Sequence, residues 1–504
     1  MHGRTVKWLA CMLAAAVVFG ACGLASAQDA ILMDPGYAMA TSQTGAAATN
    51  KLVSTSSYTS ELEARVAALE AALDEEGNGW EDVSAEKWSH RVGGLAHFDT
   101  AFYAHQDAAS EAVLGDVKNY FEARRLRLFV AGEGYGVYDY KLEVDFAAGD
   151  DYYDRGTGVQ FFDDLAEIKD AYVGIHEIPL LGYVRAGHMR EVTSLEYQTH
   201  ENFITFMERS LPVLAFHPRR QFGIAAYNYT EDEQFTISGG AFLPDINEEH
   251  KELFDDELGI DMASRVTWNP WYTAEGRGVL HLGGGYNFVD ARGTHRFRVN
   301  PEIHRVVNQD CVAVGDDPNE ISVLDSGALT IDRYSFLNFE SALVYGPFSI
   351  QSEIFLGDTE GEAGQADTDL YGAYVMGSYF LTGEHRPYSR QRAKFGRVVP
   401  FTNFFIVRTA DGSIQSGLGA WELAARWSWV EIRDGIDATT VQTAGSLNDV
   451  TLGVNWYLNP NARVMCNYIH SWADWRGPND GQQPRLGDTN GETDTVACRV
   501  QVDF

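Results

Sequence analysis

The chain has 504 residues, of which 45% are apolar and 22% are charged, and its formal net charge is −34. Such an excess of negative charge makes it a poor binder of nucleic acid, because one polyanion repels another. The 49 glycines and the 12% aromatic residues, beside only 14 prolines, favour a β-rich protein with many tight turns.

The N-terminus, residues 1–27, has the layout of a secretory signal peptide. Two basic residues precede the apolar stretch 8–24, and the small residues 25–27 place cleavage before Gln28. A membrane-anchor helix is the alternative, which the shortness of the Ala- and Gly-rich stretch disfavours. No later stretch is apolar for long enough to span a membrane as a helix. A chain like this can enter a membrane only as a closed barrel, because only helices and closed sheets satisfy every backbone group in lipid.

Two short zones follow the signal peptide. Residues 28–59 are rich in Ala, Ser, Thr and Gly, which predicts a flexible linker. Residues 60–76 predict a helix whose apolar residues have the 4-3-4 spacing of a heptad seam: Leu62, Val66, Leu69 and Leu73. Two heptads are too few for an isolated coiled coil, so we predict a short coiled-coil stem between chains that other contacts already hold together. A single amphipathic helix lying on the body is the alternative.

From residue 90 onward, apolar and polar residues alternate with the period of a β-strand. Residues 138–146 give the clearest example, and the segments 280–288, 421–429 and 496–504 repeat it. In a membrane barrel the apolar face meets lipid and the polar face lines a wet lumen. Alternation by itself fits a soluble β-sandwich equally well, because both folds have one apolar face per sheet.

The turns and the strand count indicate a barrel. Short turns such as 345–347 and 458–461 alternate with long acidic loops, as in outer-membrane barrels. Sixteen or seventeen segments resemble strands, and the doubtful segment is 295–305, which Pro301 interrupts. Because bacterial single-chain barrels have an even number of strands, we predict an all-β, transmembrane antiparallel barrel of sixteen strands over residues 90–504.

The last residue, Phe504, ends an alternating strand. A terminal aromatic residue in this position resembles the membrane-insertion signal that the barrel-assembly machinery recognises. We therefore predict that Phe504 serves as this signal.

Seven motifs resemble, in order, those of the phosphate-selective porins of the O and P type. They are 121–128 (FEARRLRL), 168–173, 206–210 with 218–223, 346–353, 419–426, 453–460 and 499–504. The resemblance implies a trimeric outer-membrane porin of sixteen strands, with loop material folded into the pore and with arginines and lysines along an anion path.

Strand alternation indicates which cations face the lumen. Arginine suits phosphate because its planar fork donates two parallel hydrogen bonds and stays charged. The anion-guiding candidates are Arg125, Arg127, Lys141, Arg185, Arg209, Arg219 and Arg220. Arg124 falls on the lipid side near a strand start, where it can snorkel to the interface. The irregular segment 190–218 is expected to fold inward and narrow the pore. Pairing of these cations with nearby carboxylates is the alternative, and the sequence leaves both open.

A basic run and a pair of cysteines are each interpreted without a functional role. The basic run 386–397 is interpreted as a solvated loop rather than as an anion attractor or a lipid contact. Cys466 and Cys498 fall on strands expected to be neighbours, and they are interpreted as apolar fillers rather than as a disulfide.

The sequence holds no motif of a hydrolase, a metalloprotease or a nucleotide-binding enzyme, so we predict neither catalysis nor a cofactor nor a metal. The predicted function is an outer-membrane porin, a water-filled channel for passive diffusion of small solutes with a preference for anions such as phosphate. Its predicted partners are two further copies in a homotrimer, the outer-membrane lipid and the assembly machinery. A non-selective or structural outer-membrane protein and a soluble all-β binding protein or hydrolase are the alternatives.

Overall fold

The computed structural model describes residues 88–147, 151–154, 159–162, 166–244, 259–307, 322–362, 366–408, 413–434, 443–475 and 489–504. The predicted signal peptide, linker and stem, with the seam residues Leu62, Val66, Leu69 and Leu73, lie outside these ranges. None of the helices in the described ranges has the length and apolar character needed to cross a bilayer.

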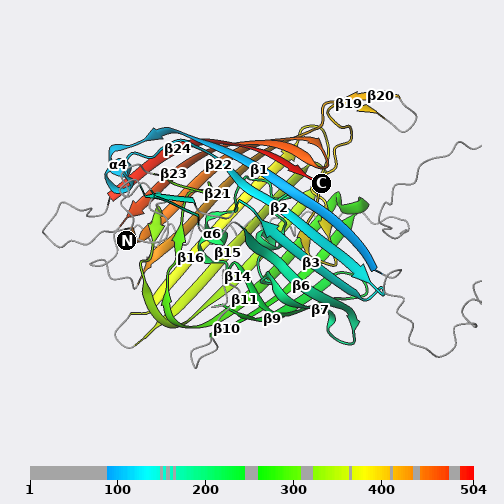
Figure 1. The fold of residues 1–504 in the computed structure, drawn as a ribbon, viewed down its shortest axis with the longest axis horizontal. Coiled ribbons are helices and arrows are strands. Elements are labelled where there is room, and N and C mark those ends of the chain that lie inside the picture. Colours follow the sequence, from blue (N-terminus) through cyan, green and yellow to red (C-terminus); the bar gives the residue numbers. More distant parts are fainter. Residues whose placement is uncertain are drawn as a thin grey trace, which may run out of the picture.

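Sixteen antiparallel strands close into one barrel (Figure 1). The strands are β1 (Trp88–Gln106), β2 (Tyr120–Gly134), β3 (Tyr138–Asp145), β6 (Glu167–Ile178), β7 (Gly182–Arg190), β8 (Arg220–Tyr229), β9 (Phe235–Leu243), β10 (Ile260–Thr273), β11 (Gly278–His295), β14 (Leu329–Tyr345), β15 (Phe348–Gly361), β16 (Thr368–Phe380), β21 (Ala420–Asp434), β22 (Gly445–Asn459), β23 (Ala462–Trp475) and β24 (Thr489–Asp503). The predicted count of sixteen is confirmed. The sandwich alternative is wrong, because the strands form one closed sheet.

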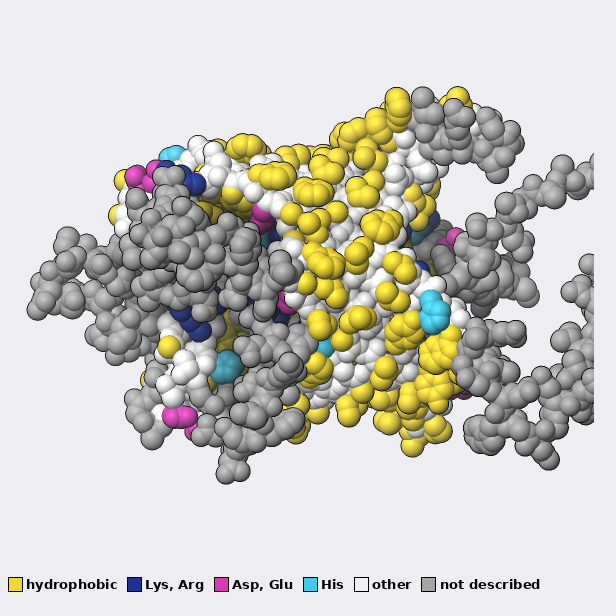
Figure 2. Space-filling model, viewed as in Figure 1, with side chains coloured by type: hydrophobic (Ala, Val, Ile, Leu, Met, Phe, Trp, Pro, Cys, Tyr) yellow, Lys and Arg dark blue, Asp and Glu magenta, His cyan; other side chains and the backbone are white. Residues whose placement is uncertain are grey.

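The strands expose their apolar faces outward and bury their polar faces inside. On β3, Leu142 is exposed while Glu143 and Asp145 are buried. On β24, Val500 is exposed while Arg499 is buried. Apolar side chains cover the outer surface of the strands in Figure 2, and charged ones gather toward the two ends. This distribution suits a barrel surrounded by lipid hydrocarbon, where a charged side chain on the outer face would destabilise the protein.

The two rims of the barrel differ. One rim carries short turns, for example 135–137 and 460–461, and we call it the short-turn rim. The C-terminus lies here: Phe504 exchanges two backbone hydrogen bonds of 3.0 Å with Gly94 of β1. The opposite, long-loop rim carries α4 (Ala108–Leu114) and the hairpin of β4 (Asp151–Asp154) and β5 (Val159–Phe162). The role of Phe504 as an insertion signal stays a prediction.

Three connections fold into the barrel. The first inward segment, 191–219, follows β7 and holds α5 (Leu195–Gln198) and α6 (Leu211–Phe216). The second is described over 296–307 and 322–328 and holds β12 (Arg298–Val299) and β13 (Leu324–Asp325). The third, 383–400, enters from the short-turn rim and holds β17 (Tyr388–Ser389) and β18 (Lys394–Phe395).

The first of these segments confirms the expected inward fold of 190–218. The second explains why the doubtful stretch 295–305 adds no barrel strand, because most of it lies inside. The solvated-loop interpretation of 386–397 is wrong, since Arg386, Ala393 and Phe395 are buried. Beyond this segment, β19 (Phe405–Arg408) and β20 (Ile414–Gly417) form a hairpin that projects from the rim (Figure 1).

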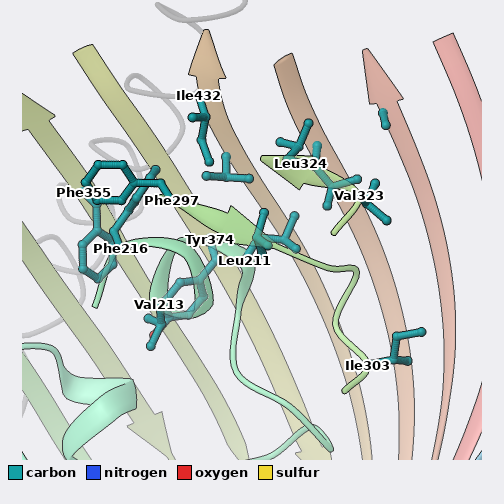
Figure 3. Close-up of a cluster of buried hydrophobic side chains, with 14 of the residues drawn as sticks. Leu211, Val213, Phe216, Phe297, Ile303, Val323, Leu324, Phe355, Tyr374 and Ile432 are labelled. Atoms are coloured by element: carbon teal, nitrogen blue, oxygen red, sulfur yellow. The ribbon is translucent and has the colours of Figure 1, made fainter. Parts of the chain in front are cut away.

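An apolar core forms where the first two inward segments meet the barrel wall. Figure 3 shows Phe216 of α6 beside Phe297 and Phe355, with Leu211 close to Tyr374. The Phe216 ring stacks on Phe336 of β14 with centroids 5.1 Å apart. The inner wall is therefore apolar around Phe336, Phe355 and Ile432, where strand alternation alone suggests a wet surface.

Two local features differ from the sequence-based expectations. Cys466 and Cys498 lie directly opposite each other on β23 and β24, with Cα atoms 4.2 Å apart, and form a disulfide. The filler interpretation is therefore wrong. On β2, the register shifts so that His97 pairs with Arg125 but Phe98 pairs with Ala123. This β-bulge turns Arg124 inward, so its expected position toward lipid is wrong.

Candidate functional site

The first inward segment carries three buried glutamates that reach the barrel wall. They are Glu196, Glu201 and Glu208, and each forms ion pairs with arginines on the strands. A buried carboxylate is costly unless a cation and hydrogen bonds compensate it. The arginines of the wall and the glutamates of the segment therefore depend on each other for burial, and together they fix the segment across the lumen.

Glu208 collects three arginines from the two ends of the chain. Its carboxylate oxygens lie 3.0 Å from Arg124, 3.3 Å from Arg125 and 2.7 Å from Arg499. Burial alone would raise the pKa of Glu208, but these arginines hold that pKa well below its usual value. Glu208 therefore stays ionised, and its negative charge cancels much of the positive charge that Arg125 would otherwise present to an anion in the lumen.

Glu201 is the centre of a second network. Its carboxylate lies 3.1 Å from Arg127 and 3.7 Å from Arg220, and it also pairs with Arg190. Burial would raise the pKa of Glu201, yet Arg190 and Arg127 keep it well below its usual value. The network contains four cations and four carboxylates: Arg127, Lys141, Arg190 and Arg220 with Glu143, Asp145, Asp170 and Glu201. Its charges balance.

Four of the seven predicted cations thus face the lumen but are paired. Arg125 pairs with Glu208, Arg127 with three carboxylates, and Lys141 and Arg220 share Asp170 at 2.7 and 2.6 Å. For these four, pairing with carboxylates is the alternative that the structure supports.

Arg185 and Arg209 are held without a carboxylate. The guanidinium of Arg185 lies over the rings of Tyr172 and Tyr183, at 4.3 and 4.8 Å from their centroids. Arg209 donates to backbone carbonyls, among them that of Thr199 at 3.1 Å. No ion pair of either arginine occurs among the described residues. Arg219 is exposed, and it too has no ion pair in the described part of the chain. The positive charges of these three arginines are therefore not neutralised by an ion pair with any described carboxylate.

The third inward segment adds a cation that strand alternation could not predict. Lys394 of β18 is half-buried inside the barrel, and within the described ranges its ammonium has no carboxylate partner. Burial, together with the positive charges of Arg392 and Arg185, lowers the pKa of Lys394 to about 7. We call Arg185, Arg392 and Lys394 the free-cation cluster.

Contacts on both sides fix this cluster. The hydroxyl of Tyr388 lies 2.6 Å from Nδ1 of His281 on β11, and Arg265 donates to the carbonyl of Ala393 at 2.8 Å. The backbone N–H of Phe395 donates to the hydroxyl of Thr199 at 3.4 Å. The first and third inward segments, which enter from opposite rims, therefore meet beside the free cations.

Several wall arginines were not among the predicted candidates, although strand alternation marks them as inward-facing, and Arg426, Arg463 and Arg499 are three of them. Arg426 lies 3.0 Å from Glu196 and also pairs with Glu302 of the second inward segment. Arg463 donates to the carbonyl of Ile204 at 2.9 Å. Arg499 pairs with Asp99 and Glu208. Each of these arginines contacts an inward segment. Alternation along one strand cannot predict such a contact, because the two residues are far apart in the sequence.

The chain is similar in sequence or fold to several known outer-membrane proteins. Porin O of Pseudomonas aeruginosa is 24% identical over 422 residues, which cover 80% of this chain and 87% of that protein. Among solved structures, OmpT of Vibrio cholerae and an anion-selective porin from Comamonas acidovorans each have a TM-score of 0.46 and 12% identity, covering 83% of this chain and 100% of theirs. The outer-membrane channel DcaP of Acinetobacter baumannii has a TM-score of 0.44 and 11% identity, covering 84% of this chain and 99% of its own.

The family model described as phosphate-selective porin O and P matches residues 100–504, which is nearly the whole barrel. The chain therefore belongs to the phosphate-selective porin O and P family and is a porin of the bacterial outer membrane.

Proposed function

We propose that this porin is a passive, non-enzymatic channel that prefers small anions, phosphate among them. The observation that carries the anion preference is the free-cation cluster. A cation without a carboxylate partner in a low-dielectric wall attracts an anion, whereas the charge of a paired cation is largely cancelled. Several weak sites in series conduct better than one tight site, since an ion must also leave. The balanced Glu201 network would position the first inward segment without holding the anion.

The relatives support the solute class. The family is named for phosphate selectivity, and one solved porin of similar fold is described as anion-selective. The net charge of −34 opposes the entry of anions at long range, but salt screens this repulsion beyond about 10 Å at 0.1 M. Charges within a few ångströms of the path therefore decide selectivity.

We further propose a homotrimer in outer-membrane lipid, with residues 60–76 as its stem and 28–59 as the linker to the barrel. Trimeric assembly is described for an OmpT structure of similar fold. The signal peptide 1–27 would direct export, and Phe504 would be recognised during assembly. Cross-linking of the intact chain, followed by its mass in detergent, tests the trimer.

Ion selectivity in planar bilayers tests the channel. The reversal potential in a potassium chloride gradient should show preference for chloride, and added phosphate should reduce the chloride current. The substitution Lys394→Met should lower the anion-to-cation permeability ratio. Lys118→Met is the matched control, because Lys118 lies between α4 and β2, outside the barrel strands, and pairs with Asp116.

Equal permeability to both ions, unchanged by Lys394→Met, would instead identify a non-selective pore. A purified trimer that gives no conductance would contradict the channel itself.

A further inference from the structure

Four buried side chains, two carboxylates and two amides, lie together where the first inward segment begins. Glu191 follows β7, Gln221 lies on β8, Asp261 on β10 and Asn287 on β11, and all four are buried. They are in contact: the amide of Asn287 donates to Asp261 at 2.6 Å and reaches Glu191, while Gln221 reaches Asp261. We call these four residues the acid–amide cluster.

Each member of the acid–amide cluster has one buried oxygen without a hydrogen-bond partner. These atoms are Oε2 of Glu191, Oε1 of Gln221, Oδ2 of Asp261 and Oδ1 of Asn287. A buried oxygen without a partner costs the desolvation energy of that group, about 1–3 kcal/mol and more for a charged one. Four such oxygens, contributed by four segments of the chain to one cluster, indicate that a ligand with positive charge belongs between them.

The charges point to the same conclusion. The other buried glutamates of the first inward segment have arginine partners, but in the described ranges no basic side chain forms an ion pair with Glu191 or Asp261. The hydroxyl of Thr193 donates to Glu191 at 2.9 Å and lies 3.0 Å from Nε2 of His217. Burial lowers the pKa of His217 to about 4, so His217 is neutral and supplies no countercharge.

We propose that the acid–amide cluster binds one divalent cation of the calcium class. Two carboxylates neutralise its charge. The nitrogens of the two amides now donate to these carboxylates, and rotation of each amide would present its oxygen instead and complete an all-oxygen set of the kind that hard cations prefer. No three His, Cys, Asp or Glu side chains gather to hold a metal in the described part of the chain, so neutral oxygens have to contribute ligands. A small cavity that Asn287 lines together with Thr193, His217 and several phenylalanines lies beside the cluster.

The bound cation cross-links the first inward segment to three strands. Glu191 is the first residue of that segment, and the other three ligands are fixed on β8, β10 and β11. Removal of the cation leaves two adjacent carboxylates that repel each other and that burial penalises. The cation therefore holds the segment that crosses the lumen, and this role is independent of which solute the porin conducts.

Calcium binding to the purified trimer tests the proposal. The protein is treated with a chelator and then titrated with calcium, with magnesium in a parallel titration. The neutral, nearly isosteric double variant Glu191→Gln, Asp261→Asn should bind one calcium ion fewer per chain than the unchanged protein. Calcium should raise the Tm of the unchanged protein more than that of the variant. Comparison with the variant is needed because carboxylates elsewhere on this acidic chain also bind cations weakly.

Asp449→Asn is the matched control, since Asp449 is a buried, inward-facing carboxylate on β22 with an oxygen that also lacks a partner. This control should keep the full number of calcium ions. The proposal is wrong if the double variant and the unchanged protein bind the same number of ions with the same rise in Tm. It is also wrong if calcium has no effect on the unchanged protein while acidification stabilises it, because the two acids then share a proton. Neither result depends on the ion selectivity of the pore.

Discussion

Arg499, on the last strand of the barrel, donates two hydrogen bonds of 2.7 and 2.6 Å to Asp99 on the first. The two residues are 400 positions apart in the chain and directly paired in the sheet. Arg499 also lies 2.7 Å from Glu208, so one guanidinium joins the closing seam to the first inward segment. Closure of the barrel and the position of the segment in the lumen are therefore linked at one side chain.

The substitution Arg499→Met should destabilise the barrel strongly. It leaves Asp99 with no countercharge at the seam and removes one of three cations from Glu208. Breaking a buried ion pair from one side costs about 3–5 kcal/mol. Thermal unfolding in detergent measures the change. The control is Arg333→Met, because Arg333 pairs with Glu360 where both side chains are about half exposed. An exposed pair contributes about 0–1 kcal/mol. Equal losses in the two variants would contradict the structural role of Arg499.

The anion preference should fall as the pH rises through about 7. Lys394 has a pKa of about 7, so it is charged below this pH and neutral above it. Each deprotonation removes one positive charge from the free-cation cluster, and the permeability ratio for anions declines. Lys394→Met should give a low ratio at every pH, whereas Lys394→Arg should keep a high one, because arginine stays charged. Reversal potentials between about pH 6 and pH 8 measure the effect. A wild-type ratio that is constant over this range would exclude Lys394 as a determinant.

Neutralising Glu208 should have opposite effects on stability and selectivity. Glu208→Gln removes the carboxylate that three arginines share, which is expected to cost about 3–5 kcal/mol because the arginines remain buried. The same change releases positive charge into the lumen and should increase the anion-to-cation permeability ratio. Unfolding temperature and reversal potential are measured on one preparation. Glu360→Gln, on the outer face, should change neither quantity much. A lower anion preference in Glu208→Gln would contradict the view that Glu208 masks the arginines.

The disulfide between Cys466 and Cys498 should stabilise the barrel near its seam. The two cysteines are 32 positions apart, and a cross-link of this kind typically contributes about 2–4 kcal/mol. The double substitution to serine should lower the unfolding temperature, and a reductant should lower that of the unchanged protein alone. Mass measurement after alkylation, with and without reduction, determines whether the bond is present. Two free thiols in the exported protein would contradict it.

The sequence by itself determined the barrel. Alternation along β2, β3 and β24 identified the lipid-facing and inward-facing residues, because a membrane penalises every outward polar side chain at its own position. The same local pattern placed Arg125, Arg127 and Lys141 on the inner face. It gave sixteen or seventeen strands, and the rule that bacterial single-chain barrels have an even number decided for sixteen. The pattern failed at Arg124, where a single bulged residue reverses the alternation.

Only the tertiary structure decided which inward cations are free. Arg127 and Lys394 are both cations inside the barrel, but Glu201 neutralises the first and no carboxylate in the described ranges pairs with the second. Glu201 lies 74 positions from Arg127 in the chain, and Lys394 lies on a segment that enters from the opposite rim. Coulomb energy depends on the distance between charges in space and on their burial, and neither quantity is encoded in the spacing of residues along one strand.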